Sequence, residues 1–205
     1  IIENNLTIIL RDLIDYLIKI YSDQGVKQLN NQASKDLILF FRERMKNILK
    51  EKKIRPDIIE ASISSHLSDN FLELYKKTLI MNKFISKELG KNAISTYKRA
   101  SNILDQEKLN TKNGPDAVLF KQEEEKELFE RINSIRKSFT LKDQRKNYED
   151  HLRLLSETKL STDKFFENVK VNDENQDIKN NRLELLQILC TTFNSFVDFS
   201  KLEGS

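Results

Sequence analysis

LELLQILCTTFNSFV, residues 183–197, repeats apolar side chains at intervals of three and four residues. The repeat consists of Leu183, Leu186, Leu189, Cys190, Phe193, Phe196 and Val197. This spacing predicts an amphipathic α-helix with one face in a hydrophobic core. Because Cys190 lies on that face, we expect its thiol to behave as a small buried hydrophobe.

The same period recurs upstream and predicts further helices. The expected apolar faces lie within residues 6–21, 37–49, 69–89, 93–104, 120–139 and 148–155. Gly25 stands at the expected end of the first helix, and Ser34 is expected to cap the second. Pro56 is expected to open a short third helix, Gly90 to stop the fourth, and Ser161 to open the helix before the last.

Two stretches interrupt the helices. Asn113, Gly114 and Pro115 form the strongest break in the chain and predict a long loop. The polar stretch 172–181 precedes the last helix, which we expect to begin at Asn181 because Glu184 follows at the spacing of a capping box. No internal repeat and no sustained heptad occurs in the sequence. The predicted fold class is therefore all-α, a bundle of about eight helices with a smaller helical layer before a C-terminal bundle.

Composition agrees with a helical fold and limits the function. The 205 residues include only four Gly and two Pro, and 33% are charged. The net charge of +3 is far below that of a protein that wraps duplex DNA by charge alone, so any nucleic-acid contact must be local. A single cysteine excludes an internal disulfide and fits a reducing cytoplasm. No apolar run approaches the roughly 20 residues that cross a membrane.

Signals for catalysis are missing from the sequence. His66 and His151 stand far apart, so we expect no metal site. Nucleotide-binding glycine motifs and the G-x-S-x-G nucleophile motif do not occur. The carboxylates of residues 123–125 are expected to face solvent, which leaves them without the burial that raises a pKa for acid–base catalysis. The chain begins with Ile1 and not with Met, and we expect a fragment that catalyses nothing by itself.

TYKRASNIL, residues 96–104, places cations and an amide on one side of a predicted helix. Tyr97 and Ala100 fall on the apolar side, whereas Lys98, Arg99 and Asn102 fall on the opposite one. Such a face can hold a phosphate or simply contact water.

Ordered along the chain, several segments resemble one enzyme family. They are FFRERMKNILKEKKIRPDIIEA (40–61), YKRASNIL (97–104), FFENVKV (165–171), NNRLELLQIL (180–189) and FVDFSKLEG (196–204). Together they resemble the C-terminal region of the β subunit of bacterial heterotetrameric glycyl-tRNA synthetase, which ends in an anticodon-binding module called DALR. The sequence departs from the family at Lys170, where a methionine is common, and at Lys179, where an arginine is common.

The resemblance implies a division of the chain and of the enzyme. Residues 1–88 would continue from a missing upstream part that includes an HD-like domain, and residues 89–205 would form the DALR-like domain. It implies a cytoplasmic α2β2 glycine–tRNA ligase whose α subunit uses ATP, glycine and Mg²⁺, while this fragment holds no metal or cofactor. Its partners would be glycine tRNA and the α subunit, and its function the binding of the anticodon arm.

Cations and one amide are the candidate tRNA-binding residues. They are Lys98, Arg99, Asn102, Lys170, Lys179 and Arg182. We expect Arg182 to project from the first turn of the last helix, beside backbone N–H groups that favour a phosphate. Tyr97, Phe165 and Phe166 either stack on bases or lie in the core. The alternative function is a helical module for subunit assembly without RNA contact, which would expose an apolar patch instead of a basic one.

Overall fold

A computed structural model describes residues 1–25, 31–64, 70–107, 114–140 and 147–203. These residues form nine α-helices and two short 3-10 helices, and their only strand-like pairing is an isolated bridge between Ile9 and Asn70. The predicted all-α class is therefore confirmed. The predictions on His66 and Asn113 lie outside the described residues. None of the described helices is long and apolar enough to cross a membrane.

The chain divides into two compact units, residues 1–82 and 83–205. The division after residue 88 remains a sequence-based prediction. The first unit contains α1 (Leu10–Asp23), α2 (Asn31–Glu51), α3 (Pro56–Ser64) and most of α4 (Phe71–Ile85). The second unit contains α5 (Glu88–Glu107), η1 (Ala117–Leu119), α6 (Glu123–Thr140), α7 (Tyr148–Ser156), α8 (Thr158–Asn168), α9 (Gln176–Asn194) and η2 (Phe199–Lys201).

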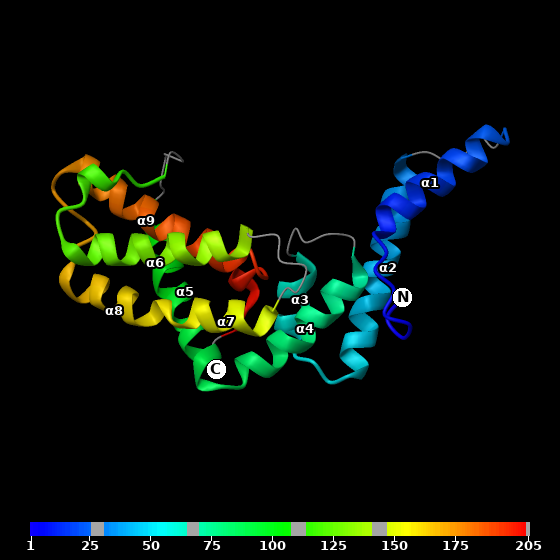
Figure 1. Ribbon diagram of the computed structural model, residues 1–205, viewed down its shortest axis with the longest axis horizontal. Coiled ribbons are helices and arrows are strands. Elements are labelled where there is room, and N and C mark those ends of the chain that lie inside the picture. The colour runs from blue at the N-terminus through cyan, green and yellow to red at the C-terminus, as the bar shows by residue number, and fades with distance from the viewer. Residues whose placement is uncertain (26–30, 65–69, 108–113, 141–146, 204–205) are drawn as a thin grey trace. The chain divides into compact units, whose positions relative to one another are not determined.

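In the first unit, α1 and α2 run antiparallel as a helical hairpin (Figure 1). Gly25 follows α1 with a φ of 86° and opens the turn, as expected of a residue after a helix. The prediction for Ser34 is wrong, because α2 already begins at Asn31. Ser34 is buried inside α2, where its hydroxyl donates a hydrogen bond to the Asp15 carboxylate of α1 at 2.9 Å. Pro56 is the first residue of α3, which confirms its prediction.

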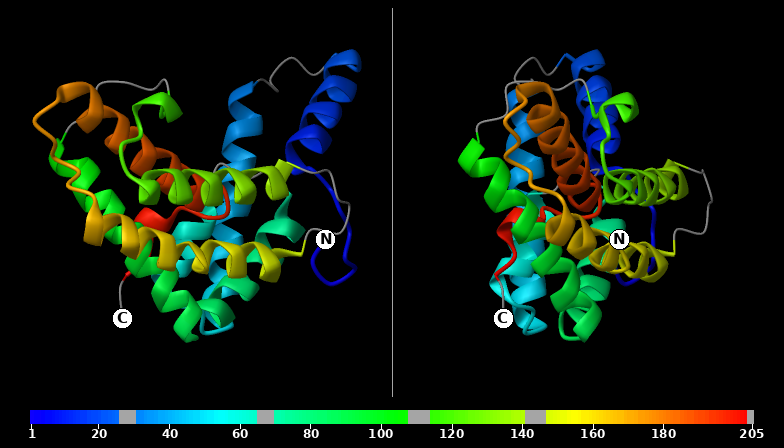
Figure 2. Two further views of the ribbon diagram at one scale, coloured as in Figure 1. Left: turned by 60° about the vertical axis from the view of Figure 1, so that its left-hand side comes forward. Right: turned by 90° about the vertical axis from the view of Figure 1, so that its left-hand side faces the viewer.

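In the second unit, α6 lies between α8 and α9, and α5 packs against both α8 and α9 (Figures 1 and 2). The centre of this bundle is aromatic. Phe193 and Phe199 meet edge to face with centroids 5.0 Å apart, and Tyr97 lies 5.7 Å from Phe199. Cys190 is buried on the same side of α9, and burial raises the pKa of its thiol to about 12. Its predicted place in the core is confirmed.

Three predicted helix limits in the second unit are wrong. Gly90 lies inside α5 and does not stop α4, which ends at Ile85. A Cβ at Gly90 would lie 2.3 Å from the carbonyl oxygen of Phe84, so glycine allows the close approach of α4 and α5 at this corner. Ser161 is buried inside α8, which begins three residues earlier at Thr158.

The third wrong limit is the start of α9, which lies at Gln176 and not at Asn181. Asn175 caps this helix, because its side chain accepts hydrogen bonds from the N–H groups of Asp177 and Ile178 at 2.9 and 3.2 Å. Asn181 is buried one turn into the helix. Its amide binds the backbone of Asp116, accepting from the N–H at 2.6 Å and donating to the C=O at 3.0 Å.

Candidate nucleic-acid interface

The outer face of α5 carries the first group of candidate residues. Tyr97 and Ala100 are buried, while Arg99 and Asn102 are exposed and Lys98 is half-buried. The predicted division of this helix into an apolar and a polar side is therefore confirmed. Lys98 has no ion-pair partner among the residues that the structure describes.

Arg99 is held in place by α8. Its guanidinium carbon lies 4.3 Å from the ring centroid of Phe166, and its Nη1 lies 3.6 Å from a carboxylate oxygen of Asp163. A guanidinium above an aromatic face is attracted by the ring quadrupole, and the contact limits the rotamers of the side chain. The Arg99 side chain nevertheless keeps 49% of its surface exposed. One side of the guanidinium is therefore oriented by the protein, while its remaining surface faces solvent.

Sequence reasoning left three aromatic residues undecided between base stacking and the core, and Phe166 is the one that reaches this surface. Of the three aromatic candidates, Phe165 is fully buried and Tyr97 is buried with its hydroxyl accepting a hydrogen bond from Asn194 at 3.2 Å. Phe166 alone among them is half-buried, and it contacts Arg99. Helical spacing does not separate Phe165 from Phe166, because they lie three and four residues after the buried Thr162 and so both fall on its side of α8.

The second group surrounds the loop between α8 and α9. Arg182 is only 4% exposed, and its guanidinium has three internal partners. Its Nε donates to Glu125 at 2.9 Å, and its Nη1 donates to the Asp173 carboxylate at 2.7 Å and to the backbone C=O of Lys170 at 2.9 Å. The prediction that Arg182 projects outward from the first turn is wrong, because α9 begins six residues before it.

Glu125 completes this buried network. It is 0% exposed, and its second carboxylate oxygen accepts the backbone N–H groups of Lys121 and Gln122, each at 2.8 Å. The expectation that all carboxylates of residues 123–125 face solvent is therefore wrong for Glu125. One carboxylate thus satisfies the free N–H groups at the start of α6 and also the buried Arg182.

Asp173 forms the outer edge of the network. Its pKa is lowered mainly by the hydrogen bond from the backbone N–H of Asn175, and also by Arg182 and the charge of Lys170, while partial burial opposes the shift. The ionised carboxylate therefore holds the loop against Arg182 at neutral pH.

Lys170 and Lys179 lie on either side of this loop. The side chain of Lys170 is exposed, although its carbonyl is held by Arg182. The Lys179 ammonium lies 2.6 Å from the carboxylate of Glu107 at the end of α5. The structure therefore brings Lys179 to the C-terminal end of the helix that carries Lys98, Arg99 and Asn102.

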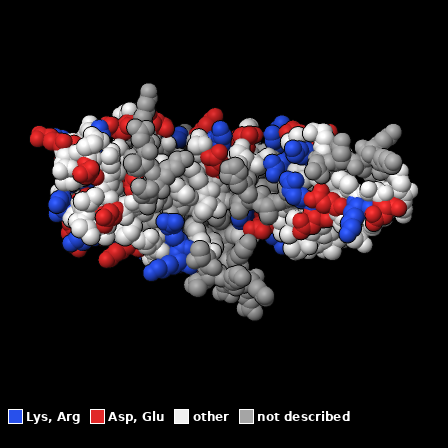
Figure 3. Space-filling view, turned by 90° about the horizontal axis from the view of Figure 1, so that it is seen from above, with Lys and Arg blue, Asp and Glu red and all other residues white. Residues whose placement is uncertain are grey.

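Charge on the surface is mixed. Acidic and basic side chains lie next to one another over the face that Figure 3 shows. Attraction of an anionic partner therefore depends on the local placement of single cations such as Lys98 and Lys170.

Comparisons with known proteins show which family the second unit resembles. The family described as the DALR anticodon binding domain matches residues 93–199, just over half of the chain. The chain is 37% identical over 203 residues to the glycine–tRNA ligase β subunit of Rickettsia felis (strain ATCC VR-1525 / URRWXCal2), covering 98% of the chain and 28% of the relative. It is 36% identical to that of Rickettsia africae (strain ESF-5), covering 98% of the chain and 29% of the relative. The chain thus spans less than a third of the length of the curated relatives it matches.

Proposed function

This chain belongs to the DALR anticodon-binding domain family, and on that premise we propose that its second unit binds the anticodon arm of glycine tRNA. In this proposal the chain is the tRNA-binding portion of a glycine–tRNA ligase β subunit. The observation that carries the proposal is the family match over residues 93–199, which includes every candidate cation and the Arg99–Phe166 contact.

The chemistry of an anticodon loop suits the outer face of α5. Bases in a single-stranded loop can stack on aromatic or guanidinium planes and form hydrogen bonds through their Watson–Crick edges. Arg99 offers a planar fork that Phe166 and Asp163 already orient, which reduces the entropy lost on binding. Lys98 supplies a point charge for a phosphate, and the exposed amide of Asn102 can pair with a base edge.

The loop between α8 and α9 contributes charge and not base recognition in this proposal. Lys170 and Lys179 contact phosphates of the RNA backbone, which position the RNA without reading its sequence. Arg182 does not touch RNA. Its three internal partners make it the anchor that fixes the backbone of Lys170.

The holoenzyme would carry out ATP-dependent glycylation of tRNA in the cytoplasm as an α2β2 assembly. The α subunit would supply the active site with ATP, glycine and Mg²⁺. Among the described residues, no three His, Cys, Asp or Glu side chains gather in the way a metal site requires. That this chain alone holds no metal or cofactor and catalyses nothing stays a prediction from the sequence.

Footprinting tests the proposal directly. Glycine tRNA and an unrelated tRNA are each titrated with the complete β subunit, and backbone cleavage is measured along both RNAs. We expect protection of the anticodon arm in glycine tRNA at lower protein concentration than in the unrelated tRNA. Protection confined to the acceptor end, or no difference between the two tRNAs, would contradict the proposal.

One observation favours the second candidate function, a module for assembly, but only in the first unit. That function requires an exposed apolar patch. Large exposed apolar side chains gather on α1 and α2, outside the residues that match the DALR family. This apolar surface serves subunit assembly if another subunit covers it and internal packing if the same subunit does, and neither role excludes RNA binding by the second unit.

A further inference from the structure

The helical hairpin of the first unit exposes an apolar face to solvent. We define this hairpin face by six side chains that are each 38% to 62% exposed. They are Leu13, Tyr16 and Leu17 on α1 and Leu37, Phe40 and Phe41 on α2.

Helical spacing places these six side chains on one side of the hairpin. On α1, the exposed positions 13, 16 and 17 adjoin the buried line of Leu10 and Ile14 that faces α2. On α2, positions 37, 40 and 41 adjoin the buried Ile38 and Met45 in the same way. Because the two helices are antiparallel (Figure 2) and Ser34 meets Asp15 between them, helical spacing places both exposed stripes on the same side of the seam.

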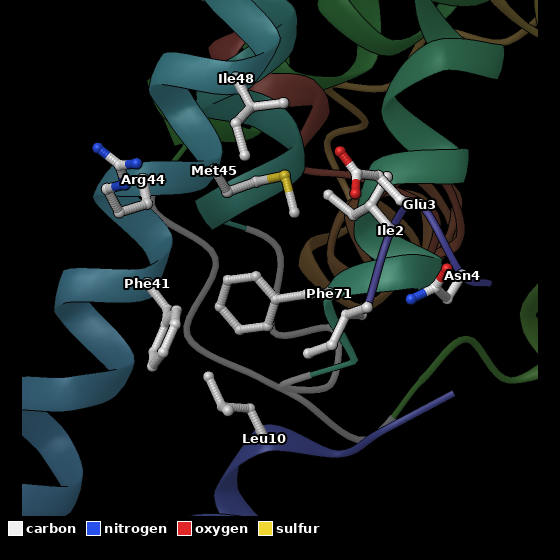
Figure 4. Close-up of a pocket in the computed structure, with 10 residues that line it drawn as sticks. Ile2, Glu3, Asn4, Leu10, Phe41, Arg44, Met45, Ile48 and Phe71 are labelled. Atoms are coloured by element: carbon white, nitrogen blue, oxygen red, sulfur yellow. The ribbon is translucent and has the colours of Figure 1, made fainter. Parts of the chain in front are cut away.

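At one end the hairpin face continues into a hollow. Figure 4 shows the rings of Phe41 and Phe71 beside Leu10 and Met45, with Ile2 of the N-terminal segment across from them. Phe41 and Phe71 pack edge to face with centroids 6.2 Å apart. The exposed face is thus continuous with an apolar wall that is already partly assembled.

We propose that the hairpin face packs against an apolar surface from another part of the same subunit, outside these 205 residues. Three of the six side chains are aromatic, and the exposed Arg44 lies beside them, three residues after Phe41 on the same side of α2. Large aromatic side chains are typical of the buried centre of a contact between surfaces, and charged residues of its rim. The curated relatives supply a source for the partner, because 28% or 29% of their length matches the chain and the rest does not.

A partner within the same polypeptide fits better than a separate chain. A free subunit that waited for another chain would expose two stripes of large apolar side chains, and such patches promote aggregation. A partner in the same polypeptide is present at a high effective concentration from synthesis onward. This inference requires that the chain is a portion of a longer β subunit, as the proposed function assumes, but it does not depend on RNA binding.

Photo-crosslinking in the complete holoenzyme tests the proposal with a matched pair of positions. Phe40 and Leu39 are both 58% exposed, but Leu39 lies on the other side of α2. Each is replaced by p-benzoylphenylalanine, which resembles Phe in shape, and the irradiated protein is analysed by mass spectrometry. We expect the probe at position 40 to form crosslinks within one polypeptide, to peptides outside residues 1–205. The yield of these crosslinks should be at least tenfold higher than with the probe at position 39. A probe at Tyr16 should give crosslinks to the same region if replacement of Phe40 impairs folding.

Three results would overturn the proposal. They are equal yields at positions 39 and 40, crosslinks that join two polypeptides, and crosslinks confined to residues 1–205. The second result would assign the hairpin face to another copy or to the other subunit. Because crosslinking is measured without tRNA, none of these results would affect the anticodon footprint.

Discussion

Helices α1 and α9 share a spacing of apolar residues but differ in what covers them. On α9, Leu186 is fully buried among the helices of the second unit, whereas Leu17 on α1 is 42% exposed. Helical periodicity shows which face of a helix avoids water. Periodicity does not show whether the surface that covers this face belongs to the same stretch of chain. For the first unit, we infer that the covering surface lies outside these 205 residues.

The largest effect is expected from removing the buried charge of Arg182, which joins the start of α6 to the loop between α8 and α9. Arg182→Met leaves Glu125 buried without its cation, and breaking a buried pair in this way costs about 3 to 5 kcal/mol of unfolding free energy. Arg153→Met is the control, because Arg153 pairs with Asp150 and Glu157 at the surface and should cost at most about 1 kcal/mol. Urea unfolding of both variants measures the difference, and equal costs would refute a buried anchor.

A matched pair of leucines sharpens the comparison of the two units. In the 205-residue chain, Leu186→Ala should lower the free energy of unfolding by about 2 to 5 kcal/mol, because it opens a cavity. Leu17→Ala removes the same atoms from a partly solvated site and should lower it by less than about 1 kcal/mol. In the complete subunit the cost of Leu17→Ala should rise. Thermal melts of both variants in both proteins measure these costs. An unchanged cost of Leu17→Ala would mean that the hairpin face stays exposed.

Several of the wrong helix limits share a physical cause. Ser34, Gly90 and Asn181 each suit a helix end by local rules, yet each is used for a contact elsewhere. Ser34 binds Asp15 nineteen residues away, and Asn181 binds Asp116 sixty-five residues away. A rule that weighs only near neighbours cannot include such partners. The helices themselves were predictable, because periodicity extends over many residues and a few local exceptions do not remove it.

For the candidate site, features set by helical spacing were predictable, and features set by distant partners were not. The polar face of α5 follows from helical spacing and is confirmed as solvent-facing at Arg99 and Asn102. The burial of Arg182 was not predictable, because it depends on Glu125 and Asp173 from other segments and on the true start of α9. Whether any of these residues contacts tRNA remains a prediction.

A smaller effect is expected from pH. The pKa of Asp173 is lowered in the folded state, so its ionised form stabilises the second unit above the unfolded pKa near 3.8. This contribution is lost as the pH falls through the lower folded pKa. The destabilisation caused by Asp173→Asn should therefore be present at pH 7 and shrink below pH 3.8, as urea unfolding at both pH values can measure. A difference that is independent of pH would show that the carboxylate charge does not hold the loop.

Titration of glycine tRNA against the double variant Lys98→Ala and Arg99→Ala, in the complete enzyme, tests the central claim most directly. The control is Lys19→Ala with Lys50→Ala, which removes the same charge from two exposed positions of the first unit. The account predicts that the test variant loses about 1 to 3 kcal/mol of binding free energy for each contact, while the control binds tRNA like the unchanged enzyme. The melting temperatures of both variants should stay close to that of the unchanged enzyme. Equal affinity of test and control would contradict the assignment of the α5 face to the anticodon arm.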